Sequence, residues 1–138
     1  MINYRVILFH KQSTSARLRF LKFSYNSVCA FESIPMPANV HADLQRPTAM
    51  HPAPVIQKAA DELGLSIDDL KVEEGYRFDV EVPGEYIRIL LVGITSMDPP
   101  FSEAEAIQAR FIDLTEARGL PGIELELLRG AYEYLLGG

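Results

Sequence analysis

Polar and apolar residues alternate over residues 76–82, and a run of aliphatic and β-branched residues follows over residues 86–94. Alternation with a period of two is typical of a half-buried β-strand. Pro83 and Gly84 lie between the two segments, and this pair suits the corners of a tight turn. The pattern predicts an antiparallel hairpin, whose register a longer loop would shift by one residue. The predicted register pairs Val80 with Ile87, Phe78 with Ile89, Tyr76 with Leu91, Asp79 with Arg88 and Glu81 with Tyr86.

The second strand of this hairpin is apolar on both faces, because Leu90 and Val92 alternate with Ile89 and Leu91. Such a strand has to be covered by a helix, another strand or a partner chain. One hypothesis is therefore a protein partner, or a homodimer formed through residues 86–94.

Helices are predicted on either side of the hairpin in the sequence. Apolar residues recur at helical spacing over residues 55–63, and Gly64 follows where a left-handed residue can end a helix. Ser66 can cap a single helical turn at residues 67–70. A further apolar stripe predicts a C-terminal helix over residues 121–136.

Residues 102–114 allow two interpretations. Apolar positions from Ala104 to Leu114 recur at spacings of 3, 4 and 3 residues, which favours a helix. The alternative is a third strand over residues 110–114. The fold class expected from these elements is α+β in two layers: an antiparallel β-hairpin, with or without the third strand, covered by an N-terminal helix and two C-terminal helices.

Charge and proline divide the 138-residue chain, which has a net charge of −6. The first 35 residues hold five bases and one acid, so they carry +4 and the rest carries −10. Prolines, which deny backbone donors and disfavour helix, follow this basic segment. We interpret residues 1–34 as a basic, poorly ordered N-terminal extension, residues 35–49 as a Pro-rich linker, and residues 50–138 as a compact acidic domain.

Several classes of function are disfavoured. An isoelectric point near 5.0 argues against nucleic-acid binding. The sequence contains no run of about 20 apolar residues that could span a membrane. The single cysteine, Cys29, excludes an intrachain disulfide framework, and a cytoplasmic location is expected. Neither a nucleotide-binding glycine loop nor a nucleophile motif occurs, and the three histidines precede the predicted domain core, so we expect no cofactor and no metal.

Two loops supply the candidate ligand-binding residues. Asp98 precedes two rigid prolines in the loop 95–101, and Arg118 lies in the loop 118–122. If these loops adjoin, the two side chains could present a polar site with Tyr76 nearby. The leading hypothesis is a small cytoplasmic protein-interaction or regulatory module without enzymatic activity. The alternative is a small-molecule-binding protein or small enzyme that uses these two loops.

Four motifs resemble those of a small bacterial family with no assigned function. They are HPAP (51–54), DPPF (98–101), EARGLP (116–121) and ELLRGAYEYLLG (126–137). The resemblance covers about residues 50–138 and implies a compact two-layer α+β domain. It implies no catalytic residues.

Overall fold

The computed structural model describes residues 4–43 and 52–137. In these residues the chain forms eight strands, three α-helices and two single-turn 3₁₀ helices. The strands are β1 (Tyr4–Lys11), β2 (Leu18–Lys22), β3 (Cys29–Ala30), β4 (Asn39–Ala42), β5 (Leu70–Val72), β6 (Phe78–Val82), β7 (Glu85–Ile94) and β8 (Arg110–Ile112). The helices are α1 (Ala53–Leu63), η1 (Ile67–Asp69), α2 (Phe101–Ala106), η2 (Leu114–Glu116) and α3 (Gly122–Leu136).

The strands form one mixed sheet in the order β4-β6-β7-β1-β2-β8, with β3 beside β1 and β5 beside β7. At its centre β1 and β7 run parallel, from Tyr4 opposite Arg88 to Phe9 opposite Gly93. The predicted sheet of two or three strands was therefore wrong. A parallel pair joins strands through a long crossover, so its partner is not visible in the local pattern of either strand.

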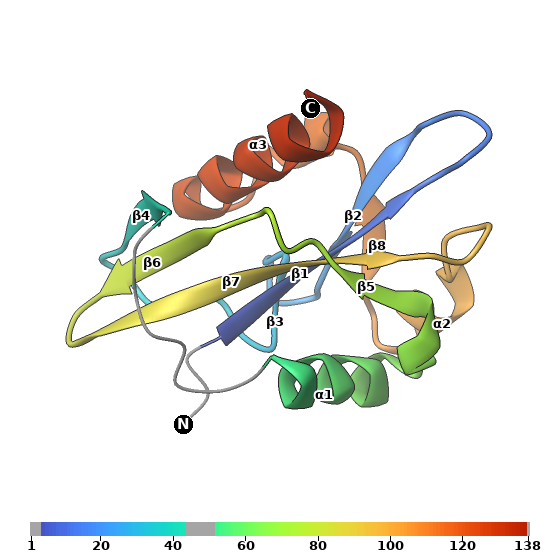
Figure 1. Cartoon of the computed structure of the whole chain (residues 1–138), viewed down its shortest axis with the longest axis horizontal. Helices are drawn as coiled ribbons and strands as arrows, with labels where there is room; N and C mark the ends of the chain where they lie inside the picture. The colour runs from blue at the N-terminus through green and yellow to red at the C-terminus, as the bar shows by residue number, and fades with distance from the viewer. Residues whose placement is uncertain (1–3, 44–51, 138) are drawn as a thin grey trace.

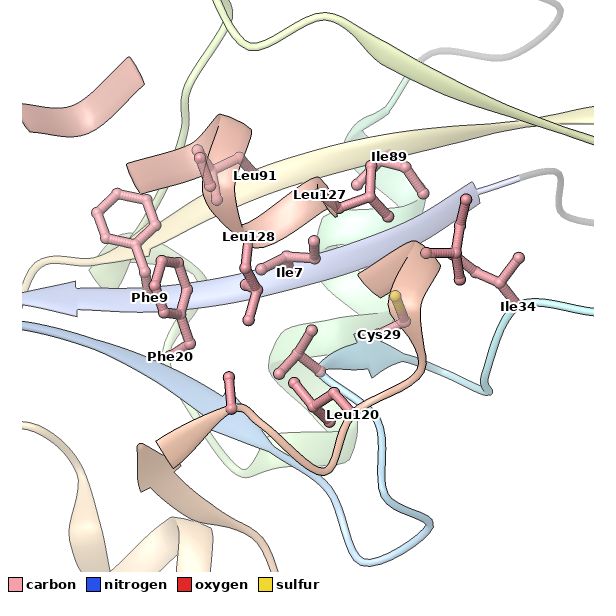
Figure 2. Packing of buried hydrophobic residues seen from close by; sticks show 14 of the residues in the cluster. Ile7, Phe9, Phe20, Cys29, Ile34, Ile89, Leu91, Leu120, Leu127 and Leu128 are labelled. Carbon is pink, nitrogen blue, oxygen red and sulfur yellow. The ribbon is translucent and has the colours of Figure 1, made fainter. Parts of the chain in front are cut away.

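Helices cover both faces of the sheet, so the fold has three layers and not the predicted two (Figure 1). On one face, α3 packs against β1, β2 and β7, and Figure 2 shows Leu127 and Leu128 beside Ile7 and the phenyl rings of the strands. On the other face, Val55 of α1 and side chains of α2 share a core with β1 and β7. The third layer is required because both central strands are apolar on both faces.

Four of the eight strands, β1 to β4, come from residues 4–42, which the sequence analysis placed in an extension and a linker. Val6, Ile7 and Leu8 have no exposed surface. Gly93 of β7 leaves room for the neighbouring ring of Phe9, because a Cβ at position 93 would lie only 2.8 Å from the Phe9 Cζ atom. Residues 4–42 are thus part of the same sheet and core as the rest of the chain.

Most of the local predictions for residues 55–94 are confirmed. The β6–β7 register is the predicted one from Phe78 opposite Ile89 to Glu81 opposite Tyr86, and Gly84 takes a positive φ. The predicted pairing of Tyr76 with Leu91 does not form, because β6 begins only at residue 78 and β5 pairs with the end of β7.

The structure also settles the end of the first helix and the choice between helix and strand at residues 102–114. Gly64 ends α1 in the left-handed conformation, and the Ser66 hydroxyl accepts a hydrogen bond from the Asp68 N–H at the start of η1. Residues 102–114 divide into α2, β8 and η2, so the strand alternative holds at residues 110–112.

The apolar strand β7 is not an edge strand. It pairs with β6 and β5 along one edge and with β1 along the other. The expected homodimer through residues 86–94 therefore loses its basis, since the chain itself covers this strand. Within the described ranges, no helix is both long and apolar enough to cross a membrane.

Candidate functional site

The three side chains predicted to bind a ligand lie in different surroundings. Asp98 is exposed and accepts a hydrogen bond from Gln12 Nε2 at 3.1 Å, while its carbonyl accepts one from the Ser96 hydroxyl. Arg118 is exposed in the loop before α3. Among the residues that the structure describes, no hydrogen bond or ion pair joins Asp98 to Arg118.

Tyr76 belongs to the core and not to a surface site. Its ring is buried in the α3-side core, and its hydroxyl donates to the Leu127 carbonyl at 3.0 Å. Burial raises the pKa of this hydroxyl, so it stays a neutral donor. As ligand-binding residues, Asp98, Arg118 and Tyr76 stay predictions, but none of them lines the pocket described next.

An apolar pocket of about 210 Å³ lies between α1 and the segment that joins β2 to β3. We call it the apolar pocket. Its apolar side chains include Phe23, Tyr25, Phe31, Ala59, Leu63 and Ile107. Ser24 and Glu62 add the polar groups of its lining.

A tight turn over residues 23–27 builds one wall of the apolar pocket. The Phe23 N–H donates to the Ser27 carbonyl at 2.7 Å, and Asn26 takes a left-handed φ of 56°, which asparagine tolerates better than most residues. The rings of Phe23 and Tyr25 stack in nearly parallel planes, with centroids 5.5 Å apart.

The Tyr25 hydroxyl fixes this turn to the next strand. It donates to the Cys29 carbonyl at 2.7 Å, and burial raises its pKa well above the ordinary value. The hydroxyl therefore stays protonated at neutral pH, and the aromatic wall is held in place by a hydrogen bond that does not titrate.

The opposite wall comes from one turn of α1. Ala59 and Leu63 present small and medium apolar side chains toward the pocket, four residues apart on one face of the helix. Lys58 lies over the ring of Phe31, with its Nζ atom 4.2 Å from the ring centroid. Glu62 is exposed, so its carboxylate lies at the rim and not in the apolar interior.

A second, polar hollow of about 310 Å³ adjoins the first, and we call it the polar hollow. It is lined by Lys22, Phe23, Ser24, Asn26, Gln108 and Arg110, so it shares two lining residues with the apolar pocket. Lys22 and Arg110 are directly opposite each other in the antiparallel β2–β8 ladder. Gln108 has a φ of 60°, an unusual conformation for a residue of this type.

The side chains of Cys29 and His10, two further reactive groups, are buried in structural positions. The Cys29 thiol lies in the α3-side core, and burial raises its pKa, so it is not an activated nucleophile (Figure 2). His10 has no exposed surface, and one ring nitrogen, Nε2, donates to the Ser96 carbonyl at 2.7 Å. No group of three or more metal-ligating side chains comes together within residues 4–43 and 52–137.

Neither hollow could be predicted from the sequence, because the lining residues come from segments far apart in the chain. The turn signal in Ser24-Tyr25-Asn26-Ser27 was present, but residues 1–34 were interpreted as an extension. Lys22 and Arg110 are brought together only by the β2–β8 pairing, which no local pattern predicts. A search for turn residues between two short apolar runs in the first 34 residues could have found the turn, although not its partners.

In comparisons with known proteins, no protein-family model and no curated protein sequence matches this chain. The resemblance to a small bacterial family therefore stays a prediction, and function has to be argued from the geometry.

Proposed function

We propose that this protein binds a small molecule that carries an apolar or aromatic ring system, and that the apolar pocket holds this ring. The observation that supports the proposal is a hollow of about 210 Å³ in which three aromatic side chains face Ala59 and Leu63 on one turn of α1. Pockets that bind small molecules are typically concave, mostly apolar and supplied with a few polar groups.

The lining also suggests how such a ring would be held. The aromatic wall offers ring faces and edges, and aromatic pairs prefer offset or edge-to-face contacts. At the rim, the Glu62 carboxylate can only accept hydrogen bonds when it is ionised, so it favours a ligand with an N–H or O–H group at that end.

The protein-interaction hypothesis has less support. It rested on an uncovered apolar strand at residues 86–94, and β7 is paired on both of its edges. The small-molecule alternative is favoured instead, although at a different place from the two loops named in the sequence analysis. A cytoplasmic location remains part of this proposal, and the single cysteine, which can form no intrachain disulfide, is in keeping with it.

The test uses 1-naphthol, a neutral two-ring probe, titrated into the full chain and followed by amide chemical shifts in NMR. We expect saturable shifts centred on Phe31, Ala59 and Leu63. A titration without saturable shifts, or with shifts centred elsewhere, would overturn the proposal.

A matched pair of variants assigns the binding to the apolar pocket. Ala59→Leu places a larger side chain in the pocket and should abolish the binding of 1-naphthol. Gln57→Leu adds the same side chain on the exposed side of α1 and should leave binding unchanged. If Ala59→Leu fails to fold, Ile107→Phe fills the pocket from the half-buried residue that follows α2 and tests the same point.

A further inference from the structure

We infer that the polar hollow binds an anionic group of the same ligand, so that the ligand is a ring system that carries a phosphate. This inference rests on the proposed function, because it assigns the second half of the ligand to the hollow next to the apolar pocket. Its basis is the pair of bases, Lys22 and Arg110, that face each other across β2 and β8.

Two like charges directly opposite each other in an antiparallel ladder repel, and this arrangement is destabilising in the absence of a counter-charge. Among the described residues, neither Lys22 nor Arg110 forms an ion pair or a side-chain hydrogen bond. The chain as a whole is acidic, with 19 acids against 13 bases, so a shortage of carboxylates does not explain the pair.

The other bases in the same part of the sheet show the contrast. Arg17 of the β1–β2 turn forms two hydrogen bonds with the Asp113 carboxylate, at 3.1 and 2.9 Å. Arg19 of β2 donates to Gln12 at 2.9 Å and lies over the ring of Phe101. Lys22 and Arg110 line a hollow instead, where an anion of the ligand can approach both of them.

The rest of the lining suits an anion. Ser24 and Gln108 offer side-chain donors, and within the described chain no carboxylate lines the polar hollow. Arginine and lysine beside such donors form the charge-assisted hydrogen bonds by which phosphate groups are bound.

The two hollows together fix the orientation of the ligand. They meet at Phe23 and Ser24, so a molecule that spans them places its ring beside Tyr25 and Phe31 and its phosphate between the two bases. The carboxylate of Glu62 on the apolar side repels an anion, so the reverse orientation is disfavoured.

The experiment compares 1-naphthyl phosphate with 1-naphthol on the full chain, by calorimetry and by amide chemical shifts. Two charge-assisted hydrogen bonds to a phosphate should make the phosphate probe bind at least about tenfold more tightly than the neutral one. Added sodium chloride should weaken the binding of the phosphate probe and leave the binding of 1-naphthol nearly unchanged.

Variants that remove one positive charge show which residues cause the preference for the phosphate probe. Lys22→Ala and Arg110→Ala should each reduce the preference for the phosphate probe, and together should remove it, while the affinity for 1-naphthol stays the same. Arg129→Ala removes one positive charge from an exposed position of α3 that lines neither hollow, and should keep the full preference.

The outcomes separate the two proposals. If neither probe binds, the proposed function fails. If both probes bind equally well, or if the double variant keeps the preference, the apolar pocket stands and the phosphate inference is overturned. If Lys22→Ala does not fold, Lys22→Gln keeps a polar side chain of nearly the same length and tests the same charge.

Discussion

The two central strands, β1 and β7, are alike in sequence and structure, although they were interpreted in opposite ways. Each contains a central run of buried aliphatic residues, 6–8 in β1 and 89–92 in β7, whose side chains alternate between the two faces of the sheet. They pair in parallel, residue for residue, from Tyr4 beside Arg88 to Phe9 beside Gly93. Because their apolar side chains point to both faces of the sheet, both strands contribute to the core on each face.

The difference between them is how clearly the sequence marks the turn to the neighbouring antiparallel strand. β7 follows β6 through a tight turn, so the pattern around residues 76–94 contains both strands of that pair. β1 also has a near partner, β2, but residues 12–17 between them contain no glycine or proline to indicate a turn, and its parallel partner β7 lies about 80 residues later. The basic charge of residues 1–35 and the prolines that follow them suggested an extension, but these features do not determine the position of β1, which lies in the centre of the sheet.

The largest effect on stability is expected when the N-terminal strands of the core are removed. A chain that begins at Met50 lacks β1 to β4, half of the strands. It would leave one edge of β7 unpaired, and it would remove many of the strand side chains on which α1 and α3 pack. We expect this fragment not to fold cooperatively, as measured by thermal melting in circular dichroism and by amide dispersion in NMR.

Hydrogen exchange on the full chain gives the matched measurement. Amides of β1 should exchange as slowly as those of β7, because both strands lie in the centre of one sheet. A cooperative melt of the fragment, or rapid amide exchange over residues 4–11, would show that these residues are not needed for the folded core and would support their interpretation as an extension.

Single truncations in the two central strands test whether they contribute equally. Ile7 of β1 and Leu91 of β7 are register partners, and neither has exposed surface. We expect Ile7→Ala and Leu91→Ala each to lower the free energy of unfolding by about 2–5 kcal/mol, because each leaves a cavity in the α3-side core. Urea unfolding with Lys11→Ala as the control checks this, since Lys11 is exposed at the end of β1.

A small effect of Ile7→Ala beside a large one of Leu91→Ala would contradict this equality. It would mean that β7 carries the core alone, and that β1 packs on it without contributing much to stability.

The elements that could be predicted have near partners and a recognisable turn or cap, whereas β1 and β2 are also close in sequence but lack such a signal. The β6–β7 hairpin, its register over Phe78–Glu81 and the glycine that ends α1 all follow from local periodicity and turn chemistry. The third layer and the parallel pair could not, because several arrangements of distant strands satisfy the same requirement for burial. The predicted cover for residues 86–94 was a helix, a strand or a partner chain, and it is a strand of the same chain together with helices on both faces.

The candidate site was less predictable than the fold. Loops with prolines directed attention to Asp98 and Arg118, whereas the hollows are formed where residues 22–31 meet α1 and β8. Lys22 and Arg110 are 88 positions apart, and each one alone is an ordinary surface base. Their facing each other is a property of the sheet register, which depends on the whole fold.

Glu124 joins the C-terminal helix α3 to the N-terminal part of the sheet, at residues 27 and 28, by hydrogen bonds. Its carboxylate, on a residue with no exposed surface, accepts from the Ser27 hydroxyl and from the Val28 N–H, both at 2.8 Å. Burial raises the pKa of this carboxyl above its ordinary value, and the two hydrogen bonds only partly oppose that effect. A raised pKa means that the folded state binds the proton more tightly than the unfolded state does.

The smallest expected effect is therefore a dependence on pH. The stabilisation from the protonated carboxyl is complete below the pKa of an unfolded glutamate, about 4.3, and is lost as the pH rises through the higher pKa of the folded state. Glu124→Gln cannot ionise, so its free energy of unfolding should rise relative to that of the natural chain as the pH rises from about 4.3 through the folded-state pKa of Glu124, by about 1.4 kcal/mol for each pKa unit between the two states. Urea unfolding at several pH values measures this slope, and Glu126→Gln, an exposed position on the same helix, should show almost none. A slope of the opposite sign would mean that the hydrogen bonds from Ser27 and Val28 outweigh burial, and that this contact between the two regions is strongest with the carboxylate ionised.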